Sequence, residues 1–70
     1  MKAEDYAVEI RPLSAEDGGG FVATVPQLPG CMSDGDTPEH ALANAYDAIA
    51  CWLEAAVAMG RAVPAPRIDA

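Results

Sequence analysis

Seventy residues provide enough chain for one small domain and too little for two hydrophobic cores. Eleven acidic side chains against four basic ones give a formal net charge of −7, which repels nucleic-acid phosphates and argues against direct nucleic-acid binding. Hydrophobic residues make up 51% of the sequence, which excludes a disordered tail. Much of this fraction is alanine, which buries little area. We therefore expect a homo-oligomer, a dimer or larger, to supplement the stability of the domain.

The sequence shows no targeting or membrane segment. Residues 1–5 are charged and no apolar stretch follows them, unlike a signal peptide. Asn44, Asp47 and Glu54 interrupt the longest apolar run, so we expect no contact with a membrane. Two cysteines are too few for a disulfide framework. These features predict a cytoplasmic protein with a single domain over residues 1–70.

A first strand is predicted by alternating side chains in residues 6–11. Tyr6, Val8 and Ile10 fall on one face of this segment, whereas its charged residues fall on the other. A period of two is typical of a strand that is buried on one side. Pro12 is expected to end the strand because proline cannot donate to the ladder.

The next elements are predicted by turn residues. Residues 14–20 contain three consecutive glycines, which tolerate the positive φ angles of a tight turn. The apolar residues 21–25 predict a second strand in an antiparallel hairpin with the first. Residues 31–35 predict a short third strand, and residues 63–68 an additional edge strand.

A long helix is predicted to begin at Thr37. Threonine is a good N-cap, Pro38 suits the first helical position, and Glu39 complements the positive end of the helix dipole. Apolar residues recur with a period of 3.6 until Gly60, a natural stop signal. His40, Asp47 and Glu54 lie on the opposite face, among alanines.

These elements predict an α+β fold of the order β-β-β-α-β. A small antiparallel sheet of three to four strands would have one long helix packed on one face, leaving the other face and at least one edge open. The core is expected to contain the large apolar side chains of both layers, namely Tyr6, Val8, Ile10, Phe21, Leu42, Ile49, Trp52 and Leu53.

Two patterns in the sequence contain residue types that can hold a metal ion. Asp34 and Asp36 could share a hard cation, but the additional oxygen ligands of a calcium loop are missing. His40, Cys31 and Cys51 are the only soft ligands, and no two stand at zinc-finger spacing. A turn before the helix and a solvated histidine are the favoured interpretations, so we expect no metal.

The sequence also offers little for catalysis. The glycine run at residues 18–20 leads into a strand and follows two acidic residues, unlike a phosphate loop, so a hairpin tip is favoured. A cysteine nucleophile would need a histidine base, and Cys51 is too far along the helix from His40. We expect no cofactor and no enzymatic activity, with a vestigial hydrolase as the least favoured alternative.

Four motifs in order, at characteristic spacing, resemble the HicB-type antitoxin domain. The resemblance extends over roughly residues 6–66, and the segment from Asn44 to Ile49 and Trp52 also fit the pattern. Gln27 and His40 stand where the family usually has acidic residues. The motifs are GGGFVATVP at residues 18–26, LPGC at 28–31, SDGDTPE at 33–39 and GRAVP at 60–64.

The resemblance implies a partially degraded ribonuclease-H-like fold without catalytic carboxylates. It also implies binding to a HicA-type toxin, a small basic ribonuclease that cleaves messenger RNA, and masking of the toxin's active site. An acidic chain suits a basic partner. The carboxylates expected to face the toxin are Asp34, Asp36, Glu39, Asp47 and Glu54.

Two further expectations complete this interpretation. Longer family members carry a C-terminal DNA-binding module, and we expect none within these 70 residues. Without such a module, operator binding would need another chain. The alternative function is a stand-alone oligomeric interaction module without a toxin partner.

Overall fold

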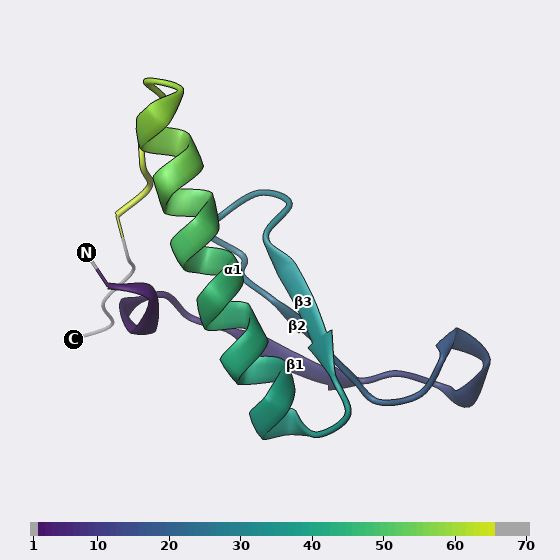
Figure 1. Cartoon of the computed structure of the whole chain (residues 1–70). Coiled ribbons are helices and arrows are strands. Elements are labelled where there is room, and N and C mark those ends of the chain that lie inside the picture. The colour runs from purple at the N-terminus through teal and green to yellow at the C-terminus, as the bar shows by residue number, and fades with distance from the viewer. Residues whose placement is uncertain (1, 66–70) are drawn as a thin grey trace.

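The computed structural model describes residues 2–65 and consists of a three-stranded antiparallel sheet covered on one face by a long helix (Figure 1). Strands β1 (Glu9–Pro12), β2 (Phe21–Thr24) and β3 (Met32–Gly35) lie in the order β1-β2-β3. Helix α1 (Pro38–Ala58) follows β3 and packs on the sheet. The predicted α+β fold is therefore confirmed.

Two short 3₁₀ helices, η1 (Ala3–Asp5) and η2 (Ala15–Asp17), were not predicted. The second of them forms part of the tip of the β1–β2 hairpin, which projects away from the helix (Figure 1). Of the edge strand expected at residues 63–68, residues 63–65 are not in a strand, and residues 66–68 lie outside the described part of the chain.

Local capping residues define both ends of α1. The Oγ1 of Thr37 accepts a hydrogen bond from the backbone N–H of His40 at 3.0 Å, as the sequence predicts for an N-cap. At the other end Gly60 has φ 69° and donates its N–H to Val57, while Arg61 donates to Ala56 at 2.8 Å. This pair of bonds is a Schellman motif. No helix within residues 2–65 is sufficiently long and apolar to cross a membrane.

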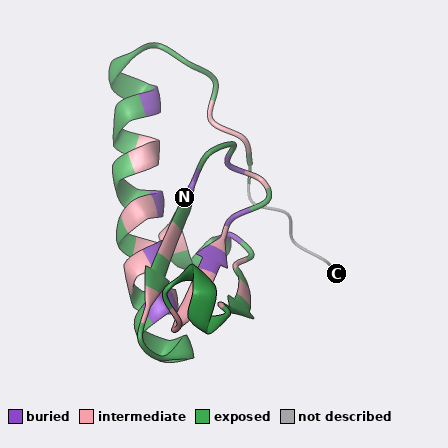
Figure 2. Cartoon of the chain, turned by 90° about the vertical axis from the view of Figure 1, so that its right-hand side faces the viewer, coloured by how far each residue is buried: buried purple, intermediate pink, exposed green. Residues whose placement is uncertain are grey.

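The helix and the sheet are joined by two clusters of different side-chain size. Under the first half of α1, Ala41 and Ala45 pack on Ala23 of β2, and all three are fully buried. Figure 2 shows that the buried positions of α1 lie on the side of the helix that is turned toward the strands. The second cluster is built from larger side chains near the later part of the helix, namely Tyr6, Val25, Leu28, Cys31 and Ile49.

Only some of the large apolar residues predicted for the core are buried. Tyr6 and Ile49 are buried, whereas the other six predicted residues keep part of their surface exposed. Leu28 is fully buried although it lies in the bend between β2 and β3, where no core residue is predicted. The fully buried alanines Ala23, Ala41 and Ala45 form a cluster between the helix and the sheet.

Gly35 at the end of β3 allows the helix N-terminus to approach the sheet. A Cβ atom at this position would lie 2.7 Å from the carbonyl carbon of His40 and closer still to the backbone nitrogen of Ala41. Both are backbone atoms of the first helical turn and cannot rotate away. Glycine is therefore required by the contact between β3 and α1.

We expect Gly35→Ala to lower the free energy of unfolding by about 2–3 kcal/mol, because the added methyl group would push α1 off the sheet. Gly60→Ala is the matched control, since nothing lies within 4 Å of its Cβ position and only its left-handed backbone is strained. We expect the control to lose about 1 kcal/mol. Urea denaturation of both variants measures the difference, and equal losses would contradict the close approach at Gly35.

Candidate protein-binding site

The strand register divides the sheet into a helix-side face and an open face. Ile10, Ala23 and Ser33 are paired across the sheet, and Ala23 packs against α1. Neighbouring residues point to the opposite face. The open face therefore carries two cross-strand rows, Glu9–Thr24–Met32 and Arg11–Val22–Asp34.

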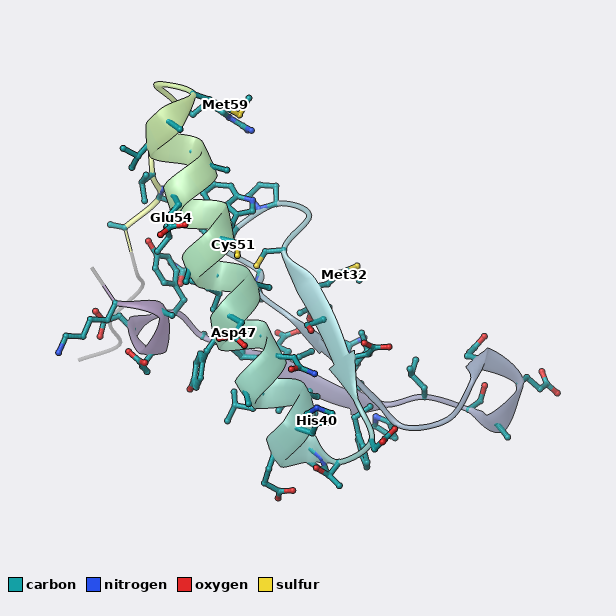
Figure 3. All side chains as sticks on the ribbon, viewed as in Figure 1. Met32, His40, Asp47, Cys51, Glu54 and Met59 are labelled. Carbon is teal, nitrogen blue, oxygen red and sulfur yellow. The ribbon has the colours of Figure 1, made fainter. Side chains whose placement is uncertain are left out.

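Asp34 is consequently separated from the other carboxylates expected to face a partner. Its side chain shares the open face with Val22 and Met32, and these residues line a shallow depression of about 340 Å³ together with Leu13 and Ser33. Met32 is 60% exposed, and Figure 3 shows its side chain on the side of β3 away from α1. The open face thus places the apolar side chains of Val22 and Met32 beside charged residues of the two edge strands.

The turn between β3 and α1 holds two more of the predicted carboxylates. Asp36 and Glu39 are both exposed, and Glu39 lies in the first turn of the helix. The backbone N–H of Asp36 donates to Nδ1 of His40 at 3.5 Å. His40 therefore helps to close this turn, while the carboxylate of Asp36 remains exposed to solvent.

The remaining two carboxylates lie on the outer face of α1. Asp47 and Glu54 are exposed, and Figure 3 shows them following one another along the helix with Cys51 between them. Seven residues separate them, which is about 10 Å along the helix axis. Asp47 lies a further two turns beyond Glu39. The structure therefore spreads these groups along the helix and does not gather them into one pocket.

The charge of this part of the chain has one sign. Residues 32–58, which form β3 and α1, contain five aspartates and glutamates and no lysine or arginine. The described cations are elsewhere: Arg11 is 3.7 Å from Glu9 on β1, Arg61 stacks 5.9 Å from the centre of the Trp52 ring, and Lys2 precedes η1. Exposed carboxylates without neighbouring cations favour contact with a basic surface.

The described residues offer no converging set of metal ligands. Within residues 2–65, no three histidine, cysteine, aspartate or glutamate side chains are grouped to hold an ion. Asp34 and Asp36, considered as a cation pair from the sequence, belong to a strand and to the following turn, with Asp34 directed to the open face. Cys31 is buried and Cys51 is exposed.

Three polar contacts, whose partners sequence reasoning did not identify, connect α1 and the bend between β2 and β3 to other parts of the chain. The Nδ2 of Asn44 donates to the carbonyl oxygen of Asp34 at 2.8 Å, which connects α1 to the edge of β3. The Nε1 of Trp52 donates to the carbonyl oxygen of Pro29 at 3.1 Å. The Nε2 of Gln27 donates to Ala65 at 3.1 Å. The only signal in the sequence was the position of these side chains on the apolar edge of the helix or in a bend.

The fold defines a small α+β domain with an acidic helix side, and the sequence comparison identifies its family. The chain matches the family described as "HicB_like antitoxin of bacterial toxin-antitoxin system" over residues 6–69. It therefore belongs to the HicB-like antitoxin family, as the motifs suggest.

Several relatives carry the name UPF0150. The chain is 42% identical to the UPF0150 protein ssr1765 of Synechocystis over 52 residues, which are 74% of this chain and 66% of that protein. It is 35% identical to ssl0259 of the same organism over 60 residues, or 86% and 78% of the two chains.

Other relatives are matched over a smaller share. The UPF0150 protein Ta0767 of Thermoplasma acidophilum is 38% identical over 42 residues, 60% of this chain and 61% of that protein. An uncharacterized 14.9 kDa protein of Haemophilus phage HP1 is 49% identical over 35 residues, which are 50% of this chain and 26% of the phage protein. No solved structure matches the chain.

Burial raises the pKa of the Cys31 thiol, because the apolar cluster around it disfavours the thiolate. We expect iodoacetamide at pH 8 to modify Cys51 in the folded protein and to spare Cys31, whereas in urea both should react. Mass spectrometry of peptides measures the two rates. Equal rates in the folded protein would show that Cys31 is not shielded.

The same shift predicts how stability changes with pH. The unfolded thiol, with a pKa of about 8.5, loses its proton before the folded one does. The contribution of Cys31 to stability is therefore fully present below that pH and declines as the pH rises above it. Denaturation between pH 7 and 10 should show the decline in the parent and in Cys51→Ala, and the decline should be smaller in Cys31→Ala.

Proposed function

We propose that this chain is an antitoxin that neutralises a HicA-type, messenger-RNA-cleaving toxin by covering the toxin's active site. The observation that carries the proposal is its membership of the HicB-like antitoxin family, over residues 6–69. The uniformly acidic segment of residues 32–58 supports a basic partner such as a ribonuclease. In this proposal the chain acts by occlusion and contributes no catalytic group.

The exposed carboxylates around α1 would guide the toxin to its binding site. Asp36, Glu39, Asp47 and Glu54 are separated along the helix, so together they present an extended field in place of one strong ion pair. Such a field raises the rate of association more than the final affinity. Apolar or backbone contacts would then supply the slow dissociation that inhibition requires.

The open face of the sheet supports a second candidate, a stand-alone module that associates with copies of itself. Val22 of the central strand and Met32 of the edge strand β3 form the apolar part of this face, and α1 covers the opposite one. Light scattering at increasing protein concentration would detect such an assembly. A monomer mass at all concentrations, together with tight toxin binding, would favour the antitoxin alone.

The electrostatic part of the proposal predicts a position-dependent effect of charge reversal. We expect the double variant Asp47→Lys, Glu54→Lys to slow association with a purified HicA-type toxin by about tenfold at low salt, with the difference shrinking at 1 M salt as charges are screened. Stopped-flow fluorescence measures the rates.

The matched control is Glu16→Lys, Asp17→Lys at the hairpin tip, which changes the net charge equally on exposed residues remote from α1. We expect this control to slow association much less. Equal slowing by both double variants would mean that total charge, and not the helix face, guides the toxin. Salt-independent association of the parent would contradict electrostatic guidance.

A further inference from the structure

The register of the sheet determines which backbone groups of β3 point outward. The N–H of Val25 donates to the carbonyl of Cys31 at 3.1 Å, in the position next to the last pair of the β2–β3 ladder, Thr24 and Met32. Hydrogen-bonded and non-hydrogen-bonded pairs alternate along an antiparallel ladder. The backbone N–H and C=O groups of Ser33 and Gly35 therefore also point toward β2. The backbone N–H and C=O groups of Met32 and Asp34 therefore point to the outer edge of the sheet.

The opposite edge of the sheet is less suited to strand addition. The N–H of Leu13 donates to the carbonyl of Gly20 at 2.8 Å, so the same alternation turns Ile10 and Pro12 of β1 outward. Pro12 has no N–H to donate, and prolines are used in this way to blunt sheet edges. Of the two edges, only that of β3 offers a donor at both outward positions.

A side chain of α1 already occupies part of this edge. Asn44 donates its amide to the carbonyl of Asp34 at 2.8 Å. A carbonyl oxygen can accept a second hydrogen bond, so this contact does not remove the acceptor from use. The N–H groups of Met32 and Asp34 and the carbonyl of Met32 complete a short template for another strand.

Charge decides what kind of strand would fit. The edge carries Asp34 itself and is followed directly by Asp36, and the neighbouring helix α1 contains no lysine or arginine. A second copy would bring two such acidic edges together and would be repelled. An extended segment rich in lysine or arginine would instead be attracted to these carboxylates.

The open face adds a preference for apolar residues at alternate positions. Successive side chains of an added strand would point to opposite faces of the sheet. Those on the open face would lie beside Met32 and next to the depression that it forms with Leu13 and Val22. The segment that fits best therefore alternates basic and apolar residues.

We propose that the outer edge of β3 is a strand-addition site for an extended segment of a partner protein in which basic and apolar residues alternate. The interaction mode is β-augmentation, in which main-chain hydrogen bonds supply affinity and alternate side chains supply specificity. This inference deepens the proposed function by naming how the basic partner is held, and it rests on that function only for the identity of the partner.

Hydrogen exchange of the backbone amides, followed by NMR, tests the site with an octapeptide of alternating lysine and valine as the probe. At saturating peptide we expect the Met32 and Asp34 amides to exchange at least about tenfold more slowly, because both become bonded to the added strand. The outward Ile10 amide of β1 serves as the internal control and should not change. No toxin is present, so the result is independent of the proposed function.

Two variants separate the backbone contact from the side chain. Met32→Pro removes the outward N–H of residue 32 and leaves the hydrogen bonds to β2 in place. We expect the peptide no longer to slow hydrogen exchange at the Asp34 amide of this variant. Met32→Ala keeps the N–H and should retain protection. A thermal transition like that of the parent shows that each variant is folded, and if Met32→Pro is unfolded, the exchange data on the parent decide.

Four results would overturn the proposal. The first is no slowing at Met32 and Asp34 with saturating peptide, and the second is slowing at Ile10 in their place. The third is equal protection by a peptide of alternating glutamate and valine, which would remove the argument from charge. The fourth is protection that rises with protein concentration without any peptide, which would identify a second copy as the occupant.

Discussion

The close approach of the first turn of α1 to β3 at Gly35 governs the rest of the structure. A side chain at this position would collide with backbone atoms of His40 and Ala41, so the helix can rest on the sheet only because none is present. Ala23, Ala41 and Ala45 continue the contact with small side chains. The later part of the helix then packs against larger residues, including Leu28 and Ile49, many of which come from outside the strands. The side chains packed against α1 are thus small under its first half and larger under its second half.

This arrangement also separates the charges of the molecule. Because α1 covers one face of the sheet, the outer surface of the helix carries Glu39, Asp47 and Glu54 with no lysine or arginine among residues 32–58. The open face holds Arg11 and Asp34 on opposite edge strands around Val22. A basic partner and an apolar partner would therefore meet different sides of the same domain, and the edge of β3 lies between these two sides.

Local signals in the sequence predicted most of the fold. The helix begins at its predicted N-cap Thr37 and ends before Gly60, because capping and proline positions act within a single turn. β1 is shorter than the alternation suggests, since Tyr6 is buried but lies outside the ladder. The buried position of Leu28 could not be predicted because it depends on how the bend between β2 and β3 folds back onto α1.

The candidate site was less accessible to sequence reasoning. Asp34, Asp36 and Glu39 are neighbours in the sequence, yet the alternation of β3 directs Asp34 to the open face. Proximity along the chain therefore overestimates how closely these carboxylates gather. The hydrogen bond from Asn44 to Asp34 joins residues ten positions apart through the packing of helix on strand, and no local pattern indicates such a contact.

Pro12 has a consequence for the behaviour of the protein at high concentration. Continuous cross-strand polymers need two competent edges on every subunit, since each copy must both receive and offer a strand. On β1 the outward position of Pro12 lacks the N–H that such growth requires. Strand addition at the β1 edge is accordingly disfavoured, whereas the β3 edge keeps both outward N–H groups. Head-to-tail stacking of copies into a continuous sheet would therefore lack one of the two edges that it needs.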